Sequence, residues 1–179
     1  MKYKTIKAGI AGAGRWGFNH IKTANGILGS GLRYVCDVFP AACEKVKGVS
    51  EEIKFTTDFE DVIKDDEVNA VIIATSAETH FELARKALNA GKNVLVEKPI
   101  TLVTKEAKEL LDIAEEKGLK LMVGHILLYH PAILKIKEMV SSGKLGKLQY
   151  VYSNRLNLGA IRTEENILWS FAPHDISVI

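Results

Sequence analysis

The residues best suited to acid–base chemistry follow a predicted buried strand. Glu97, Lys98 and Pro99 come directly after the apolar run Val94–Val96. Oxidation of a secondary alcohol removes a hydride and a proton, and a lysine at the lip of a ligand crevice could take the proton. Lysine can do this where burial and nearby positive charge favour its neutral amine, and Glu97 could orient it. The bond before Pro99 could be cis, although a Glu-Lys pair before proline is also typical of a solvated turn.

A second candidate for proton transfer lies near the end of the chain. His174 and Asp175 follow Pro173, where the sequence predicts the start of a helix. A helix N-terminus disfavours a charged imidazolium, so His174 would stay neutral and able to accept a proton. The alternative is that the pair only caps the helix. Lys98 and His174 are therefore the candidate catalytic residues.

A glycine loop near the N-terminus reads Gly12-Ala13-Gly14-Arg15-Trp16-Gly17 and has the G-x-G-x-x-G spacing. Gly12 permits a tight turn, Gly14 leaves room for a pyrophosphate, and Gly17 lets a helix approach the preceding strand. The N–H groups at the helix start, at Arg15 and Trp16, would face the phosphates. The motif alone is also typical of a plain glycine turn, but the strand predicted before it and the helix after it favour dinucleotide binding.

Asp37 ends the second predicted strand, which is close to where dinucleotide folds place a carboxylate on the ribose hydroxyls. A carboxylate at this point would repel a 2′-phosphate, and no arginine or lysine follows it immediately. The sequence therefore favours NAD over NADP as the cofactor. The alternative interpretation of Asp37 is an ordinary turn residue.

Four further residues could line the same crevice. Thr75 and Ser76 follow the apolar strand 70–74, where small hydroxyl side chains could bond to a cofactor or could instead cap the next helix. His80 lies one turn into that helix and could face the crevice or lie on the surface. His125, near the expected domain junction, could line a cleft. The five histidines and two cysteines show no zinc-binding pattern, so no metal site is expected.

These side chains can meet only if several strands end at a common edge. Short apolar runs alternate with helical periods through the first two-thirds of the chain, which predicts an α/β fold, a doubly wound parallel sheet covered on both faces. The expected strands are Thr5–Ala11, Leu32–Cys36, Ile53–Thr56, Ala70–Ala74, Val94–Val96 and Leu119–Val123. The expected helices are Arg15–Ala24, Pro40–Val46, Phe59–Lys64, Thr79–Ala90 and Lys105–Lys117.

The pattern changes near Gly124, which predicts a dinucleotide-binding domain in residues 1–123 and a second domain in residues 124–179. A helix Pro131–Val140, a long strand Leu148–Leu156 and a helix beginning near Pro173 are expected in the second domain. Because a single strand cannot make a stable sheet, this α/β domain is expected to be incomplete.

Composition limits the class of protein. The 179 residues are 47% hydrophobic and carry a net charge of +2, and no basic patch with interleaved aromatic residues points to nucleic acid. No apolar run approaches the roughly 18 residues that span a bilayer, and the first residues lead directly into a strand without room for a signal peptide. With Cys36 and Cys43 as the only cysteines, a reducing compartment is expected. These features predict a soluble, cytoplasmic protein.

Taken together, the motifs resemble the Gfo/Idh/MocA family of NAD(P)-dependent oxidoreductases. The matching pieces occur in the family's order over nearly the whole chain: the glycine loop, Asp37, Ala74-Thr75 with His80, Glu97-Lys98-Pro99, Gly124-His125 with His130-Pro131, and His174-Asp175. The resemblance implies a Rossmann domain followed by an α/β domain with a large open sheet. It also implies a substrate bound between the domains and a homo-oligomer formed through that sheet.

By the same resemblance, Lys98 would be the active-site lysine and His174 the catalytic acid/base. Many members have an aspartate four residues before that histidine, where this chain has Ser170. Proton transfer would therefore depend on Lys98 and His174 without that aspartate. The segment Asn166–Asp175 is similar to members that act on nucleotide sugars.

The leading hypothesis is an oxidoreductase that transfers a hydride between NAD and a secondary alcohol of a sugar or nucleotide sugar. Two alternatives remain open, a non-catalytic NAD-binding module and a truncated fragment without independent function. A titration with NADH, paired with an activity screen, distinguishes the first hypothesis from the second.

Overall fold

The computed structural model describes residues 6–154 and 167–179 of the chain. It divides into two compact units, Met1–Val123 and Gly124–Ile179, and each unit is described by itself.

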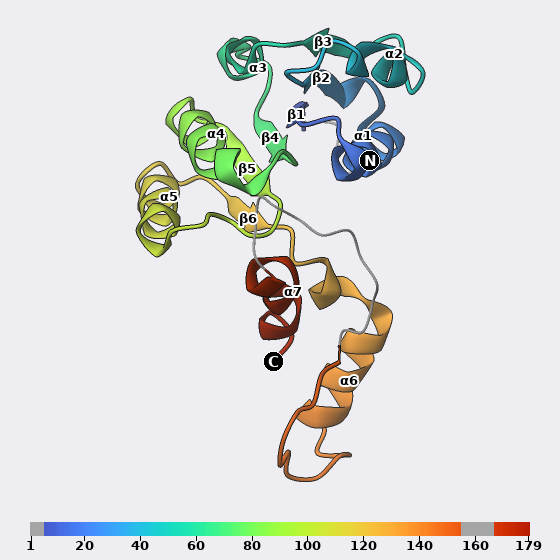
Figure 1. Cartoon of the computed structure of the whole chain (residues 1–179), viewed down its shortest axis with the longest axis vertical. Coiled ribbons are helices and arrows are strands. Elements are labelled where there is room, and N and C mark those ends of the chain that lie inside the picture. Colours follow the sequence, from blue (N-terminus) through green and yellow to red (C-terminus); the bar gives the residue numbers. More distant parts are fainter. Residues whose placement is uncertain (1–5, 155–166) are drawn as a thin grey trace. The chain divides into compact units, whose positions relative to one another are not determined.

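The first unit is built on a six-stranded sheet with the order β3-β2-β1-β4-β5-β6 (Figure 1). All neighbouring strands pair in parallel. The strands are β1 (Ala8–Ala11), β2 (Leu32–Cys36), β3 (Lys54–Thr56), β4 (Ala70–Ile73), β5 (Asn93–Val96) and β6 (Leu121–Val123). This strand order is that of a dinucleotide-binding Rossmann sheet, so the predicted fold class is confirmed.

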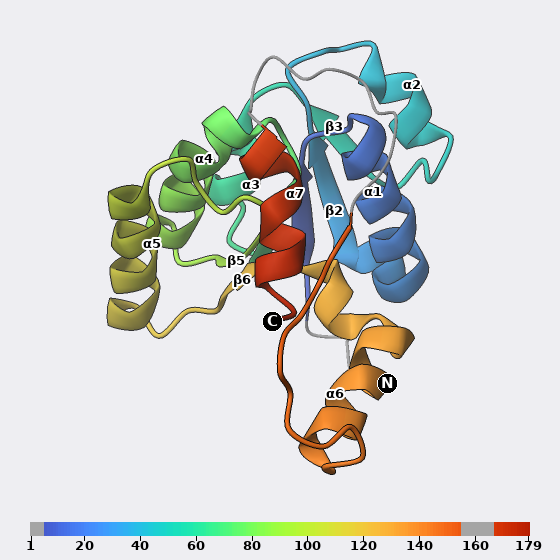
Figure 2. The same cartoon turned by 60° about the horizontal axis from the view of Figure 1, so that its bottom comes forward.

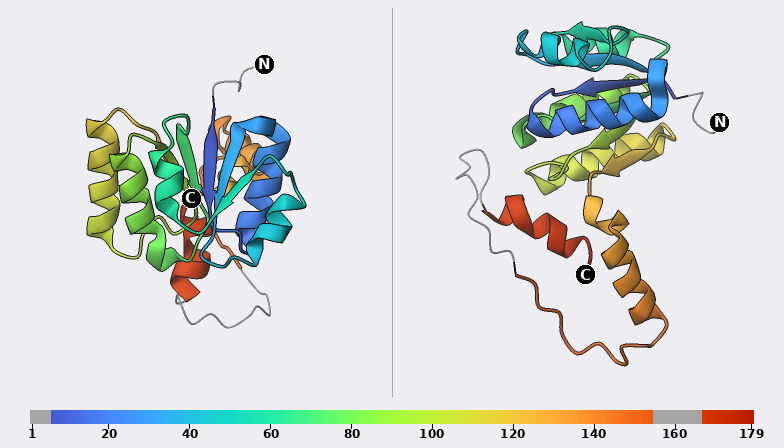
Figure 3. Two further views of the ribbon diagram at one scale, coloured as in Figure 1. Left: turned by 90° about the horizontal axis from the view of Figure 1, so that it is seen from above. Right: turned by 90° about the vertical axis from the view of Figure 1, so that its right-hand side faces the viewer.

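Helices cover both faces of the sheet (Figures 2 and 3). The helices α1 and α2 pack on one face, and α3, α4 and α5 pack on the other. Their bounds are α1 (Arg15–Leu28), α2 (Ala42–Lys47), α3 (Phe59–Lys64), α4 (Ala77–Asn89) and α5 (Thr104–Glu116). Each helix turns a stripe of apolar residues inward. Right-handed crossovers place α1 and α2 on one face while the chain passes from β1 to β3, and they place α3, α4 and α5 on the other face while it passes from β3 through β4 to β6.

Two buried clusters hold these layers together. Beneath α1 and α2, Ile10 of β1 and Val35 of β2 pack against Ile21 and Val46. On the opposite face, a larger cluster joins β4 and β5 to the three remaining helices, and Leu88 and Leu110 are completely buried in it. The strands alternate their side chains between these clusters, because successive residues of a strand point to opposite faces.

The register of the strands aligns their carboxyl ends. Ala11, the last residue of β1, pairs with Cys36 of β2 and with Ile73 of β4, and Ile73 pairs with Val96 of β5. The loops that follow these four strands therefore begin at the same edge of the sheet. Ligands of open parallel sheets bind at this edge, where the strand order reverses.

The second unit holds a short 3₁₀ helix, η2 (Ile126–Tyr129), and the helices α6 (Pro131–Ser141) and α7 (Ile167–Ile176). The predicted strand Leu148–Leu156 is wrong for residues 148–154, which form no strand, and its last two residues lie outside the described part. All strands of the described residues belong to the first unit. A segment without a neighbouring strand has no ladder to join, whatever its propensity.

The predicted start of the last helix near Pro173 is also wrong. The helix α7 begins at Ile167, and Pro173 lies inside it. Proline is a good first residue of a helix, but inside a helix it costs a backbone hydrogen bond without excluding the conformation. His174 therefore lies close to the C-terminus of α7. The expectation of a neutral imidazole at a helix N-terminus does not apply to it.

Candidate functional site

The glycine loop joins β1 to α1 at the carboxyl edge of the sheet. Gly12 has a φ of +98°, and its N–H donates to the carbonyl of Cys36 at 2.8 Å. A Cβ at Gly12 would lie 2.5 Å from the carbonyl oxygen of Ala74, and a Cβ at Gly17 would collide with the carbonyl of Gly12. Backbone packing therefore requires glycine at both positions, because helix, turn and β4 loop approach without room for side chains.

Gly14 differs from these two glycines, because a Cβ there would meet no protein atom within 4 Å. Its φ of −64° is also open to any residue. Gly14 is the N-cap of α1, where no described side chain caps the helix and no acidic residue occupies the first turn. The N–H groups of a first helical turn have no intrahelical partner and attract anions. Open space beside such a helix start fits the close approach of a pyrophosphate.

Asp37 follows β2 and holds two neighbouring loops with its carboxylate. One oxygen accepts from the N–H of Ala13 at 2.6 Å, and the other accepts from the N–H of Phe39 at 2.9 Å. The contact with Ala13 places Asp37 against the glycine loop. Asp37 is therefore more than an isolated turn residue, and its predicted contact with a ribose remains a prediction.

A cluster of Glu97, Trp16 and His20 connects α1 with the loop after β5. The indole Nε1–H of Trp16 donates to Glu97 Oε1 at 2.7 Å, and Nε2 of His20 lies 2.8 Å from the same oxygen. Glu97 is buried, with 7% of its surface exposed. Burial would raise the pKa of the Glu97 carboxyl, but the hydrogen bonds from His20 and Trp16 outweigh burial and hold the pKa below its usual range. Glu97 is therefore a carboxylate.

Sequence reasoning did not identify His20 as part of the site. It lies four residues after Trp16, so both side chains share one side of α1. That spacing indicates a common face but not a partner far along the chain. The side chain of Trp16 bonds to Glu97, and the expected contact of its backbone N–H with the phosphates remains a prediction.

Lys98 and Pro99 follow Glu97 and are joined by a cis peptide bond. Lys98 is half-buried, and its backbone N–H donates to Glu97 Oε2 at 3.2 Å. Glu97 therefore binds α1 through one carboxylate oxygen and the backbone of the lysine loop through the other. The structure brings Glu97 and Lys98 to the same edge of the sheet as the glycine loop.

His80 is neither of the two things expected from the sequence, a crevice residue or a surface residue. It is 1% exposed, with Nδ1 2.7 Å from the carbonyl oxygen of Pro99 and Nε2 3.2 Å from that of Thr75. The ring thus connects the lysine loop to the loop after β4. Because a buried carbonyl without a hydrogen bond is costly, a ring N–H of His80 that donates to either carbonyl helps to hold that loop.

Thr75 and Ser76 lie at the carboxyl end of β4, as predicted. The hydroxyl of Thr75 is 2.7 Å from that of Thr79. Ser76 is the N-cap residue of α4, but its side chain makes no capping hydrogen bond. The predicted contacts of both residues with a cofactor remain predictions.

The remaining candidates belong to the second unit. His125 precedes η2 and is half-buried, and its Nδ1 has no hydrogen-bond partner among the described residues. His174 lies in α7, and Asp175 accepts a hydrogen bond from the hydroxyl of Ser153 at 2.8 Å. The side chain of Ser170 is outside the described part. Because Lys98 belongs to the first unit, its pairing with His174 remains a prediction.

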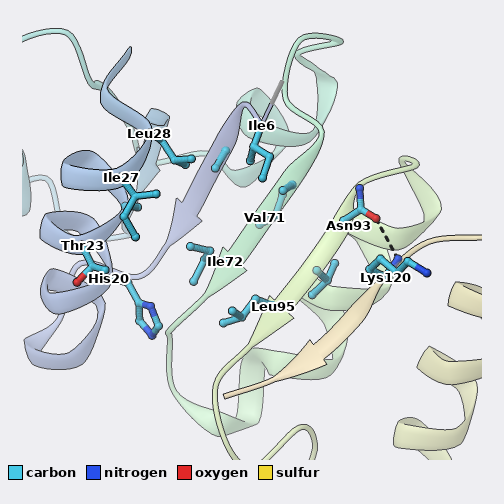
Figure 4. Close-up of a pocket in the computed structure, with 14 residues that line it drawn as sticks. Ile6, His20, Thr23, Ile27, Leu28, Val71, Ile72, Asn93, Leu95 and Lys120 are labelled. Carbon is cyan, nitrogen blue, oxygen red and sulfur yellow. Dashed lines mark hydrogen bonds between the residues drawn. The ribbon is translucent and has the colours of Figure 1, made fainter. Parts of the chain in front are cut away.

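A pocket of about 410 Å³ opens on the face of the sheet beside α1 (Figure 4). Ile27 of α1 and Ile72 and Leu95 of the strands line it, and His20 lies at its border. The lining is largely aliphatic and lies on the sheet face rather than at the carboxyl edge. Its few polar side chains, such as Thr23 and Asn93, do not form the row of backbone N–H groups that a pyrophosphate meets at a helix start. In residues 6–154 and 167–179, no helix is both long enough and apolar enough to cross a membrane.

Comparisons with known proteins agree with the Rossmann fold of the first unit. A family model described as an oxidoreductase family with an NAD-binding Rossmann fold (GFO_IDH_MocA) matches residues 6–125. The chain is 40% identical over 111 residues to an uncharacterised oxidoreductase, YhhX, of Escherichia coli, covering 62% of this chain and 32% of that protein. It is 32% identical over 147 residues to an inositol 2-dehydrogenase of Rhizobium meliloti, covering 82% of this chain and 44% of the relative.

Among solved structures, scyllo-inositol dehydrogenase from Lactobacillus casei with bound NAD(H) and scyllo-inositol is similar, with a TM-score of 0.71 and 29% identity. The similarity covers 80% of this chain and 43% of that one. The chain thus spans less than half the length of each of these three proteins.

Proposed function

Because the chain belongs to the Gfo/Idh/MocA oxidoreductase family, with its NAD-binding Rossmann fold, we propose that it binds NAD at the carboxyl edge of the sheet and serves the oxidation of a cyclic polyol. The observation that carries the proposal is the meeting of the glycine loop and the Glu97–Lys98 loop at that edge, joined by hydrogen bonds through Glu97. A phosphate-binding helix start and an amine suited to proton transfer are thereby held together.

The glycine loop and Asp37 bind the cofactor. The first-turn N–H groups of α1 face the pyrophosphate, and Gly14 leaves the approach open. Asp37, fixed against the loop through Ala13, accepts hydrogen bonds from the ribose hydroxyls and repels a 2′-phosphate. These contacts favour NAD over NADP.

Lys98 accepts the proton of the reacting alcohol. A bound NAD would supply the hydride acceptor for the carbon of that alcohol, and the alcohol oxygen then needs a positioned base for its proton. Lys98 follows the buried carboxylate of Glu97, which fixes its backbone. Lys98 is the proposed acceptor of that proton, and His174 is the second candidate for acid–base chemistry.

A cyclic polyol is the substrate class that the relatives support best. An inositol 2-dehydrogenase and a scyllo-inositol dehydrogenase are both similar to this chain over about four-fifths of its length. An inositol presents ring hydroxyls of the secondary-alcohol type that the proposed chemistry needs. The nucleotide sugars expected from the segment 166–175 remain a second substrate class to be tested.

The first test is a titration of the chain with NADH, followed by fluorescence. Saturable binding of NADH with weaker binding of NADPH is expected, and no binding of either would refute the cofactor assignment. The protein expressed from the complete gene is then supplied with NAD and myo-inositol, scyllo-inositol or nucleotide sugars, and NADH formation is recorded. Binding without turnover of any alcohol would favour the non-catalytic module.

Substitution of Lys98 tests the proposed base. Lys98→Ala should lower kcat by about 10²–10⁴-fold, the range for loss of a general base, with little change in NADH affinity. Lys105→Ala is the matched control, because Lys105 is an exposed lysine on α5. Full turnover by Lys98→Ala would exclude Lys98 as the proton acceptor.

A further inference from the structure

The cluster of Trp16, His20 and Glu97 connects two elements that are distant in sequence. Trp16 and His20 belong to the helix after β1, whereas Glu97 follows β5. Because β4 lies between β1 and β5 in the sheet, the carboxylate reaches past the end of β4 to contact α1. The helix that begins at the glycine loop is thereby tied directly to the loop of Lys98.

The chemistry of the three groups defines which of them donates. The indole N–H of Trp16 can only donate, and a carboxylate can only accept. Nε2 of His20 therefore carries the hydrogen that it shares with Glu97 Oε1. The side chain of Glu97 is 10% exposed and that of His20 is 21% exposed, so water competes little for the hydrogen bond between them, whereas Trp16 is 46% exposed. Charge-assisted hydrogen bonds of this kind are about twice as strong as neutral ones.

The hydrogen bonds of Trp16 and His20 are not needed to pack α1 on the sheet. The buried residues Ile21 and Ala24 already hold α1 on the sheet. Trp16 and His20 add two donors that meet at one oxygen of a buried carboxylate, and the second oxygen accepts from the N–H of Lys98. The position of the Lys98 backbone thus depends on the start of α1.

We propose that Trp16, His20 and Glu97 form a bridge that sets the position of Lys98 relative to NAD bound at the glycine loop, with His20 as a positioning residue. The inference rests on the proposed function, because it assumes that NAD binds at the start of α1 and that Lys98 reacts there. The bridge transmits no proton to the substrate. It holds the lysine loop at a constant distance from the helix that anchors the pyrophosphate, as productive geometry requires.

The test measures how strongly NADH shields Lys98 from acetylation by acetic anhydride, followed by mass spectrometry of the full chain after digestion. At a concentration of NADH about ten times its dissociation constant, only about one chain in ten is free of NADH. Acetylation of Lys98 should therefore be about tenfold slower in the unsubstituted chain. In His20→Ala and in Trp16→Phe/His20→Ala, we expect shielding to fall toward twofold or less. NADH affinity should change by less than about threefold, because neither side chain is proposed to bind the cofactor.

Two further variants separate positioning from general stability. His20→Gln offers an amide N–H to Glu97 and should restore most of the shielding. Asn19→Ala, an exposed neighbour on α1, should leave the shielding unchanged. The melting temperature of each variant is measured in parallel. In the protein from the complete gene, His20→Ala should lower kcat more than it raises KM, and His20→Gln should recover kcat.

Several outcomes would overturn the proposal. One is equal shielding in the unsubstituted chain and in the double variant, and another is a loss of shielding that follows the melting temperature and that His20→Gln does not rescue. NADH that binds without shielding Lys98 in the unsubstituted chain would also refute it. Failure of NADH to bind the unsubstituted chain refutes the proposed function itself, whereas failure to oxidise a polyol refutes only the substrate class and leaves the shielding test decisive.

Discussion

The two glycines Gly12 and Gly14 should respond in opposite ways to substitution by alanine. Gly12 has a φ of +98°, and its Cβ would lie 2.5 Å from a backbone carbonyl oxygen. Gly14 has a φ of −64°, and its Cβ would meet no protein atom. Gly12→Ala should therefore reduce stability, whereas Gly14→Ala should reduce cofactor binding.

The size of the Gly12→Ala effect follows from two costs and one gain. A side chain at positive φ costs about 1–2 kcal/mol, and overlap with the backbone of Ala74 costs about 1–3 kcal/mol. Reduced entropy of the unfolded chain returns about 0.4–1 kcal/mol. We expect a net loss of about 1–5 kcal/mol in the free energy of unfolding, by the sum of these terms.

Gly14→Ala should change the free energy of unfolding by less than about 0.5 kcal/mol, as is usual for an unstrained exposed position. Its methyl group would instead occupy the open approach to the start of α1. NADH affinity should fall at least about tenfold, or about 1.4 kcal/mol. Unfolding in urea followed by circular dichroism gives the first quantity, and NADH fluorescence gives the second. Equal destabilisation by both substitutions, or unchanged NADH binding by Gly14→Ala, would refute the reasoning.

Three further predictions concern Asp37, Glu97 and the cysteines. Asp37→Ser should weaken NADH binding by about tenfold while weakening NADPH binding less, because the carboxylate that repels a 2′-phosphate is lost; titration with both cofactors measures this, and a parallel loss would contradict it. Because the pKa of Glu97 is lowered in the folded chain, its contribution to stability is present above the unfolded-state pKa and is lost as the pH falls through the folded-state pKa. Glu97→Gln should therefore make the free energy of unfolding in urea depend less on pH in the acid range. An unchanged pH dependence would contradict the lowered pKa of Glu97. Burial, with Asp37 nearby, raises the pKa of the Cys36 thiol to about 11, so a thiol reagent at neutral pH should label Cys43 first, and faster labelling of Cys36 would disprove the effect.

Local pattern was sufficient for most of the first unit. The apolar runs and helical periods predicted all six strands and the helices between them, because these signals depend only on the spacing of residues along the chain. The same kind of pattern gave a wrong prediction of a strand at residues 148–154. A strand needs a neighbouring strand for its hydrogen bonds, and propensity carries no information about whether a neighbour exists. At Pro173, a residue that favours helix starts was tolerated inside α7.

Residue types alone were ambiguous at the site. Gly12 and Gly14 are identical in sequence terms, yet packing requires glycine at the first position and leaves open space at the second. His80 could be a crevice or surface residue by sequence, and it is buried between two carbonyls. The sequence did not indicate a role for His20, because its partner Glu97 follows β5, which lies two strands away from β1 in the sheet.

The sequence by itself determined the order of strands and helices along the chain, the glycine loop and the residues that carry titratable groups at strand ends. These properties are local, because periodicity and turn chemistry act over a few residues. Only the tertiary structure decided which of those groups meet, because parallel pairing in the order β3-β2-β1-β4-β5-β6 brings the ends of β1 and β5 to one edge. Glu97 can bond to both α1 and the lysine loop only at that edge, where these two segments, distant in sequence, lie close together.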